Sequence, residues 1–316
     1  MGHKKNFYHT GLDVSRNQVK QLLDAQEPFK RLFVNKGSNV AQPVTGVYEA
    51  GNDENDGLTW DTAFATIAKA IAVARSYVNW SATPWAPNIE IHIAPGLYNE
   101  HLTAMPHGCH LIGHGEAWDA DGETGVKIRP TASLYAADQA VDVGGWVNGK
   151  VTNINFETQS AVPVFDCTIL NNVQFEHCRF AGPPEATTAT AGLYTNGTVM
   201  LTVRDCRFEY LDCGIDIVYS AASASTMVRC LIDGNYFSWI SEAGIRFGDS
   251  NLLVRASFIV NNFIHGGGAS LAIGIDDNSG DSSCQIARNT IGATTGIDGE
   301  DLGTETGGNY CNGVLE

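Results

Sequence analysis

Apolar and polar positions alternate in a repeating pattern over the C-terminal two-thirds of the chain. Six segments share one shape: an apolar residue, two variable positions, a cysteine or asparagine, one variable position, and an aromatic or aliphatic residue. These segments are Val151 to Phe156 (a looser first copy), Phe175 to Phe180, Val203 to Phe208, Ile232 to Phe237, Phe258 to Phe263 and Ile286 to Ile291, with end positions 24, 28, 29, 26 and 28 residues apart. A second marker, glycine followed by isoleucine or leucine, recurs at Gly192, Gly214, Gly244, Gly274 and Gly296. Two markers that keep a similar period indicate stacked supersecondary units, the coils of a solenoid.

A single coil of this length cannot bury its apolar side chains, whereas neighbouring coils stacked at the strand spacing share one continuous core. The shared register predicts that one column points inward: Cys178, Cys206, Asn235, Asn261 and Asn289. Buried amides persist only when they are hydrogen-bonded, and stacked asparagines can satisfy one another. The sequence therefore predicts an asparagine ladder at a corner of the solenoid.

The preceding region, up to about residue 130, carries a helix and then short strands. Phe64, Ile67, Ile71 and Ala74 fall on one face of an amphipathic helix, which needs an apolar surface to cover. The segment Ile89 to Ile93 alternates apolar and polar residues as a half-buried strand, and Pro95-Gly96 then forms a turn.

The order GNDENDG, AFATIAKAI, IEIHIAPGLYNE and LIGHG resembles the first coils of the pectate-lyase-like right-handed parallel β-helix family, including bacteriophage spike and capsid-decoration proteins. The resemblance implies an all-β, single-stranded right-handed parallel β-helix with an α-helical cap at its open end. We expect residues 46–316 to form this solenoid, with the capping helix and first coils in 46–130 and the repeated coils in 131–316. Asp276-Asp277 and Gly113-His114-Gly115 stand in the wrong order for the polygalacturonases of that fold, and no other catalytic signature is complete.

Residues 1–45 differ from the rest, and we expect them to form an attachment arm with a short helix. The arm is too small to bury its own apolar side chains, so it has to pack against a larger partner. The residues expected to bind that partner are Phe7, Tyr8, Val19, Leu22, Leu23, Phe29, Leu32 and Phe33. The partner could be another protein, as we favour, or the arm's own domain.

The charge and composition of the chain limit the classes of partner that we expect it to bind. With 19 Lys+Arg against 35 Asp+Glu and no basic run, the chain offers no footprint for nucleic acid. The sequence has no stretch long enough to span a membrane and no Sec signal at its start, so we expect synthesis in a host cytoplasm and no membrane partner. The eight cysteines and nine histidines lack metal-ligand spacing, which predicts no metal, no cofactor and reduced, buried cysteines.

One outward column is the best candidate for chemistry. If Ile215, Ile245, Ile275 and Ile297 point inward, the next residues face solvent, and with Tyr194 they form a column of Asp216, Arg246, Asp276 and Asp298. Asp276 and Asp298 would lie at about the 5 Å spacing of paired glycosidase carboxylates. The other interpretation, which we favour, is a surface ladder of ion pairs in which Arg246 lies between Asp216 and Asp276.

These features favour a structural protein of a virion surface, a capsid-decoration protein or spike. We expect it to be a homotrimer that docks through its N-terminal arm on a capsid protein or a second decoration protein. The alternative is a polysaccharide lyase or glycoside hydrolase, which would use Asp216, Arg246, Asp276 and Asp298. A third hypothesis is a glycan-binding module that contacts a host glycan through Trp146 and Trp239 if these are exposed.

Overall fold

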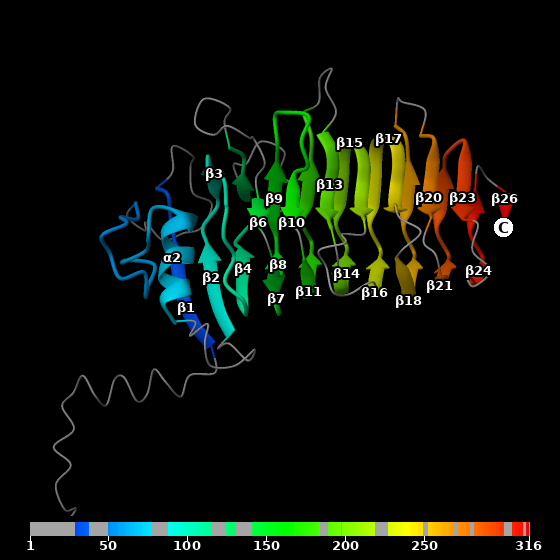
Figure 1. The fold of residues 1–316 in the computed structure, drawn as a ribbon. Coiled ribbons are helices and arrows are strands. Elements are labelled where there is room, and N and C mark those ends of the chain that lie inside the picture. Colours follow the sequence, from blue (N-terminus) through cyan, green and yellow to red (C-terminus); the bar gives the residue numbers. More distant parts are fainter. Residues whose placement is uncertain are drawn as a thin grey trace, which may run out of the picture.

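The computed structural model is a right-handed parallel β-solenoid with one short helix near its N-terminal end (Figure 1). The structure describes residues 29–37, 50–77, 88–115, 124–130, 141–143, 145–167, 169–183, 189–196, 198–218, 227–248, 252–267, 271–278, 281–299, 305–311 and 314–315. The fold predicted from the repeats and from the family resemblance is therefore confirmed.

A first ladder of parallel strands forms one wall of the solenoid. In spatial order its strands are β1 (Phe29–Val34), β2 (Asn88–Ile93), β4 (Cys109–Gly113), β8 (Lys150–Thr152), β11 (Leu170–Glu176), β14 (Thr198–Arg204), β16 (Met227–Asp233), β18 (Leu253–Val260), β21 (Asp281–Ala287) and β24 (Glu305–Gly307). Strand β7 (Trp146–Val147) also pairs with β11. Between the two ends of this ladder, each strand pairs with a strand of the coil before and a strand of the coil after, so the chain winds along one axis.

Two further ladders complete the walls and are joined through the long strands β15 (Arg207–Ile217) and β17 (Tyr236–Phe247). The second ladder also contains β3 (Gly96–Tyr98), β5 (Val126–Ile128), β9 (Ile154–Glu157), β12 (Arg179–Ala181), β19 (Phe263–His265), β22 (Thr290–Gly292), β25 (Tyr310–Cys311) and the antiparallel β26 (Val314–Leu315). The third adds β6 (Val141–Val143), β10 (Phe165–Cys167), β13 (Ala189–Thr195), β20 (Ile273–Asp277) and β23 (Thr295–Gly299).

The core is a set of inward columns in which like residues lie on like. Phe156, Phe180, Phe208 and Phe237 stack ring on ring, with successive centroids 5.6, 4.9 and 4.7 Å apart. All four side chains are buried. Stacked rings bury a large apolar area and also gain from offset aromatic contact, so this column holds successive coils in one register.

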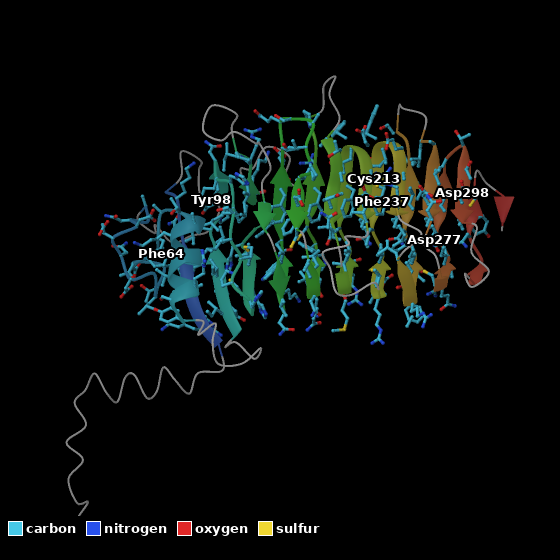
Figure 2. All side chains as sticks on the ribbon, in the orientation of Figure 1. Phe64, Tyr98, Cys213, Phe237, Asp277 and Asp298 are labelled. Carbon is cyan, nitrogen blue, oxygen red and sulfur yellow. The ribbon has the colours of Figure 1, made fainter. Side chains whose placement is uncertain are left out.

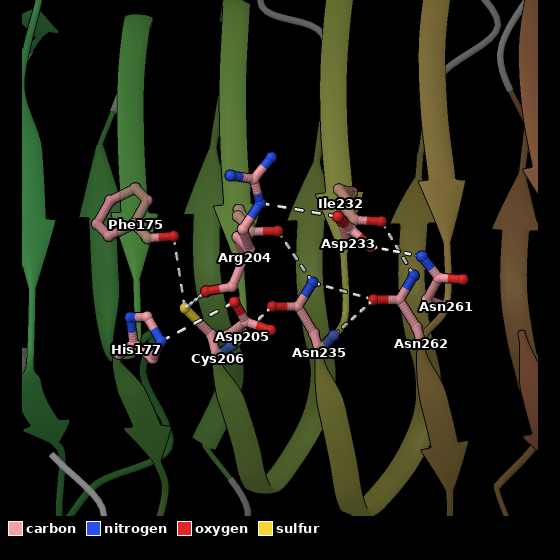
Figure 3. Close-up of polar contacts among 11 residues, drawn as sticks. Phe175, His177, Arg204, Asp205, Cys206, Ile232, Asp233, Asn235, Asn261 and Asn262 are labelled. Atoms are coloured by element: carbon pink, nitrogen blue, oxygen red, sulfur yellow. Dashed lines mark hydrogen bonds and ion pairs between the residues drawn. The ribbon is translucent and has the colours of Figure 1, made fainter.

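The predicted asparagine ladder exists, with one correction. Its members are Asn235, Asn262, Asn289 and Asn309, and Cys178 and Cys206 precede them in the same column. The backbone N–H and Nδ2 of Asn235 both donate to Oδ1 of Asn262 at 3.0 Å (Figure 3). Nδ2 of Asn235 also donates to the carbonyl oxygen of Val203 at 3.0 Å, and the same pattern repeats down the column. Each buried amide is thereby hydrogen-bonded.

The prediction that Asn261 belongs to this ladder is wrong. Asn261 is exposed and adopts a left-handed backbone with φ 58°, and its Nδ2 donates to Asp233 Oδ1 at the surface. The residues that precede the ladder positions in neighbouring coils, His177, Asp205, Gly234, Arg288 and Gly308, have positive φ as well. This corner turns through a left-handed residue, which places the next residue, Asn262, inward.

Helix α2 (Ile67–Tyr77) covers the N-terminal end of the solenoid with Ile67, Ala70, Ile71 and Ala74. Two carboxylates hold its first turn. Asp53 accepts hydrogen bonds from the backbone of Ala65 and Thr66, and Glu100 accepts from the backbone of Ile67 and Ala68 at 3.0 and 2.8 Å. Burial raises the pKa of Glu100, although these backbone bonds oppose the shift. The GNDENDG and GLYNE motifs thus stabilise the cap.

The predicted end of the arm at residue 45 does not agree with strand β1. Phe29–Val34 pairs in parallel with β2 along its whole length, and Leu32 and Val34 are fully buried in the core of the same chain. Phe33 packs its ring on His92 and on Trp60. Of the proposed docking residues, Leu32 and Phe33 therefore serve the solenoid itself, and Phe29 belongs to the same strand. Phe7, Tyr8, Val19, Leu22 and Leu23 lie outside the described residues.

All eight cysteines are free and buried, as the sequence predicts. Burial raises the pKa of the thiols at Cys109, Cys206, Cys213, Cys230 and Cys284, which keeps them in the unreactive protonated form. They act as small apolar residues of the core.

We predict that Asn262→Ala lowers the free energy of unfolding by about 3 kcal/mol, because it leaves the buried N–H groups of Asn235 and the carbonyl oxygen of Ile232 without the partner that the side chain of Asn262 supplies. Asn261→Gly is the matched control, since glycine adopts a positive φ freely and only a surface bond is lost. We expect it to change stability by less than about 0.5 kcal/mol. Denaturant titration followed by circular dichroism measures both variants. Equal effects would contradict the ladder assignment.

Candidate functional site

The outward column predicted on the third ladder is confirmed in its register. We call Asp216, Arg246, Asp276 and Asp298 the carboxylate column. Each of its members pairs with the next across adjacent parallel strands, and Tyr194 pairs with Asp216 at the start. The neighbouring residues Ile215, Ile245 and Ile275 are fully buried, as predicted, but Asp216 and Asp276 are buried as well, so the expectation that the column faces solvent holds only for Arg246, which is partly exposed, and Asp298. Figure 2 shows Asp298 on the C-terminal coils, beyond the Cys213 and Phe237 labels.

Within the carboxylate column, Asp216 and Arg246 form a paired unit. Arg246 donates from Nε to Asp216 Oδ1 at 3.0 Å and from Nη2 to Asp216 Oδ2 at 2.7 Å. A third bond joins Arg246 Nη1 to Glu242 Oε2 at 3.2 Å. Asp216 is buried, and its hydrogen bonds raise the pKa of Arg246 further. Both oxygens of Asp216 are engaged, which makes this carboxylate unsuited to act as a base or nucleophile.

Asp276 and Asp298 differ from this pair. Asn278 donates from Nδ2 to Oδ1 of Asp276 at 2.6 Å, while Asp298 is exposed. Burial is the main cause that raises the pKa of Asp276, and the negative charges of Asp298, Asp277 and Asp216 raise it further, while Arg246 opposes them. A carboxyl group with a raised pKa beside an exposed carboxylate is the elementary requirement for paired acid and base chemistry.

We predict that Asp276→Asn is more stable than the wild type at pH 7 and loses this advantage as the pH falls. The folded-state pKa of Asp276 lies above its ordinary 3.8, so the cost of ionising it in the folded state appears as the pH rises through that raised pKa. More than about one pH unit below 3.8 the carboxyl is protonated in folded and unfolded states alike. Denaturation midpoints at pH 7 and pH 2.5 measure the difference, with Asp61→Asn as control, because Asp61 is exposed and belongs to the N-terminal region, away from the carboxylate column. A destabilised Asp276→Asn at pH 7 would contradict the direction.

A second surface, which the sequence did not predict, lies on the outer side of the second ladder. We call Tyr210, Tyr236, Trp239, Phe263 and His265 the aromatic face. Tyr236 and Phe263 pair across β17 and β19, and their rings stack at 5.5 Å with an interplanar angle of 2°. The hydroxyl of Tyr236 and Nε2 of His265 are 2.8 Å apart. The side chain of Phe263 is nevertheless 44% exposed.

Tyr210 and Trp239 form the second pair of the aromatic face. Their rings stack at 5.8 Å, and both residues take a positive φ, 59° and 57°, which is costly for a large side chain. A Cβ on Gly267 would come within 2.7 Å of the Trp239 ring, so this glycine lets the indole lie flat over the backbone. Gly267 donates its N–H to Nδ1 of His265, which connects the two aromatic pairs.

A cluster of charges lies beside the aromatic face, on β5, β9, β12 and β15. We call Lys127, Arg129, Glu157, Arg179 and Glu209 the charged cluster. Arg179 donates to Glu157 Oε1 and to Glu209 Oε2, both at 2.7 Å. Lys127 Nζ lies 3.3 Å from Glu157 Oε1, and Arg129 Nη1 lies 3.6 Å from Glu157 Oε2. Glu157 is thus the centre on which three cations converge.

A cavity of about 360 Å³ opens at this cluster. Its lining is Arg129, Glu157, Thr158, Gln159, Arg179, Gly182, Pro183 and Tyr210. Because Tyr210 belongs both to the cavity wall and to the aromatic pair with Trp239, the cavity and the aromatic face form one continuous surface.

The two tryptophans considered for glycan binding have opposite positions. Trp146 is fully buried and donates from Nε1 to the carbonyl oxygen of Pro106, so it belongs to the core. Trp239 is 44% exposed. The signal that could have found the aromatic face is the true repeat, Ile259 to Ile264, which turns Phe258 and Phe263 outward.

In the part of the chain that the structure describes, no three His, Cys, Asp or Glu side chains gather as metal ligands do. In the same part, no helix is long and apolar enough to cross a membrane.

Residues 49–315 match the model of a family described as "Protein of unknown function (DUF1565)", and the chain belongs to this family. No curated protein matches the sequence.

Among solved structures, a mutant pectin methylesterase in complex with a hexasaccharide is similar, with 13% identity over 86% of this chain and 92% of that chain and a TM-score of 0.38. A GH136 lacto-N-biosidase from Eubacterium ramulus has 12% identity over 93% of this chain and 57% of that chain, with a TM-score of 0.40. These activities belong to those two proteins, and the likeness concerns the fold alone.

Proposed function

We propose that this protein is a non-catalytic rod that binds an extended carbohydrate chain along its aromatic face. The observation that carries the proposal is the exposure of Tyr236, Trp239 and Phe263 in two stacked pairs, Tyr236 with Phe263 and Trp239 with the partly buried Tyr210. Isolated exposed apolar residues are common, but a contiguous group with polar neighbours marks a binding surface. Flat rings that carry polar tips match the sugar ring, which has an apolar face and a polar edge.

The backbone supports this reading because it holds the rings rigidly. Strand pairing fixes the backbone at Tyr236 and Phe263, left-handed corners that tertiary contacts must maintain fix it at Tyr210 and Trp239, and each ring then stacks on its neighbour. Rings that are already ordered lose little conformational entropy when a ligand binds. Such a surface can bind a flexible polymer without a conformational change of its own.

A polysaccharide lyase or glycoside hydrolase remains the second candidate, and one observation favours it. Asp276 and Asp298 occupy adjacent strands, and the pKa of Asp276 is raised. Against it, Arg246 engages both oxygens of Asp216, which removes that carboxylate from any catalytic role. If the carboxylate column has only an electrostatic role, Asp276→Asn and Asp298→Asn leave any glycan binding or cleavage by the protein unchanged.

We further propose that the rod is displayed on a virion surface as a homotrimer, with residues before strand β1 as its attachment segment. The motivation is the apolar content of that segment in a chain with a formal net charge of −16. Strand β1 limits the attachment segment to residues 1–28, because Leu32 and Val34 belong to the core.

We predict that Phe263→Ala and Trp239→Ala each weaken glycan binding by about tenfold, since an aromatic side chain that stacks on a ligand ring contributes about 1 to 3 kcal/mol to binding. Phe258→Ala is the matched control, because this phenylalanine is 45% exposed but lies on β18 of the first ladder. Binding to an array of immobilised plant, bacterial and animal glycans identifies a ligand, and titration calorimetry then gives the affinities. Equal loss in all three variants, or no glycan bound by the wild type, would sink the proposal.

We predict that removing residues 2–28 converts a trimer into a monomer while the solenoid stays folded. The full chain has a mass of 33.9 kDa, so light scattering should give about three times that mass before truncation. A deletion to residue 45 would also remove strand β1 and expose the edge of β2, and its loss of assembly would not distinguish docking from unfolding. A full-length chain that is already monomeric would contradict the trimer.

A further inference from the structure

We infer that the cavity beside Tyr210 is a subsite for an anionic substituent, a carboxylate or a sulfate ester, carried by the glycan that the aromatic face binds. The inference rests on the proposed function and adds the chemical class of its ligand. It is carried by the incomplete pairing of one arginine, Arg129.

The charged cluster contains more positive than negative charge. Lys127, Arg129 and Arg179 supply three cations, whereas Glu157 and Glu209 supply two carboxylates. Arg179 is satisfied, because it bonds to both carboxylates and to Asn155 Oδ1. A partly buried charge gains from pairing, so this excess of positive charge favours an anionic ligand.

The excess charge falls on Arg129. Its contact with Glu157 Oε2 is the longest in the cluster, at 3.6 Å. The other oxygen of Glu157, Oε1, is already shared by Lys127 and Arg179. Nε of Arg129 is buried and has no hydrogen-bond partner among the described residues. The side chain is 31% exposed and lines the cavity. A guanidinium in this condition gains more from an incoming anion than a fully paired one does.

Arg246 on the third ladder shows what a complete pairing looks like in the same molecule. Its Nε and Nη2 hold both oxygens of Asp216, and Nη1 reaches Glu242. Among the residues that the structure describes, Arg129 has only the counterpart of the last of these contacts, between its Nη1 and Glu157 Oε2. The unfilled part of this guanidinium suits a two-oxygen anion that enters from the cavity, which a carboxylate or a sulfate ester supplies and a hydroxyl does not.

The ligand is a sugar derivative because the same cavity has an aromatic wall. Tyr210 lines the cavity and stacks on Trp239, so a sugar ring that lies on Tyr210 places its substituent toward Arg129. Thr158 and Gln159 add hydrogen-bonding groups to the lining. A volume of about 360 Å³ lies within the range of about 300 to 1,000 Å³ found for small-ligand sites.

The test compares ligands that differ only in charge. The probes are a uronate hexasaccharide and its methyl ester, and a sulfated neutral hexasaccharide and its unsulfated parent, each titrated by calorimetry into the full-length protein. We expect the wild type to prefer one anionic probe over its neutral counterpart by about tenfold or more. The pair that shows this preference distinguishes carboxylate from sulfate.

Arg129→Gln should remove that preference and leave the affinity for the neutral probes within about twofold. Arg129→Lys, which keeps the charge but not the two-pronged geometry, should retain part of it. Arg31→Gln is the matched control: Arg31 forms one ion pair, with Glu90, at the distant N-terminal end. Circular dichroism verifies the fold of each variant.

The outcomes separate this inference from the proposed function. A preference that survives in Arg129→Gln, or equal binding of charged and neutral probes by the wild type, overturns the subsite. If Trp239→Ala still weakens binding in that case, carbohydrate binding by the aromatic face stands without an anionic subsite. A wild type that binds none of the probes and no arrayed glycan overturns both.

Discussion

The structure depends on the hydrogen bonds that lock each coil to the next in a single register. The amide of Asn262 accepts from the backbone and side chain of Asn235 and donates to the carbonyl of Ile232, and the same bonds recur one coil further on. A slip by one residue would break the buried bonds and turn the stacked phenylalanines outward. Because the buried columns allow no shift between coils, the positions of the outward side chains are fixed as well. Both the carboxylate column and the aromatic face result from this register.

Much of this arrangement could be predicted from the sequence. The recurring glycine and isoleucine marker placed Asp216, Arg246, Asp276 and Asp298 in one column, and the strand pairing confirms each step. The marker works because the buried isoleucines repeat once per coil and strand geometry determines which neighbour faces outward. The period alone could not show that Arg246 pairs with Asp216 and leaves Asp276 to Asn278, since that choice depends on side-chain conformations.

One misread repeat concealed the aromatic face. Reading the fifth repeat as Phe258 to Phe263 places both phenylalanines inside, whereas the structure buries Ile259, Asn262 and Ile264. The left-handed turn is common to every coil at this corner and is not the cause. The misreading arises because Asn261 and Asn262 are adjacent, so Phe258 to Phe263 fits the six-residue pattern one residue before the true repeat. Strand β1 was missed for a different reason: Phe29–Val34 is separated in the sequence from its partner β2 by the capping helix. Arg129 carries no sequence signal at all.

The asparagine ladder also bears on how such a rod can change length. Every rung presents the same acceptor to the preceding coil and the same donors to the following one, so a duplicated or deleted coil would find matching partners on both sides. Each added coil would extend the rod by about 4.8 Å, the spacing of neighbouring strands. Relatives with more or fewer coils could then hold the same aromatic face nearer to or farther from the end covered by helix α2, so the length of the rod can change while both of its ends stay the same.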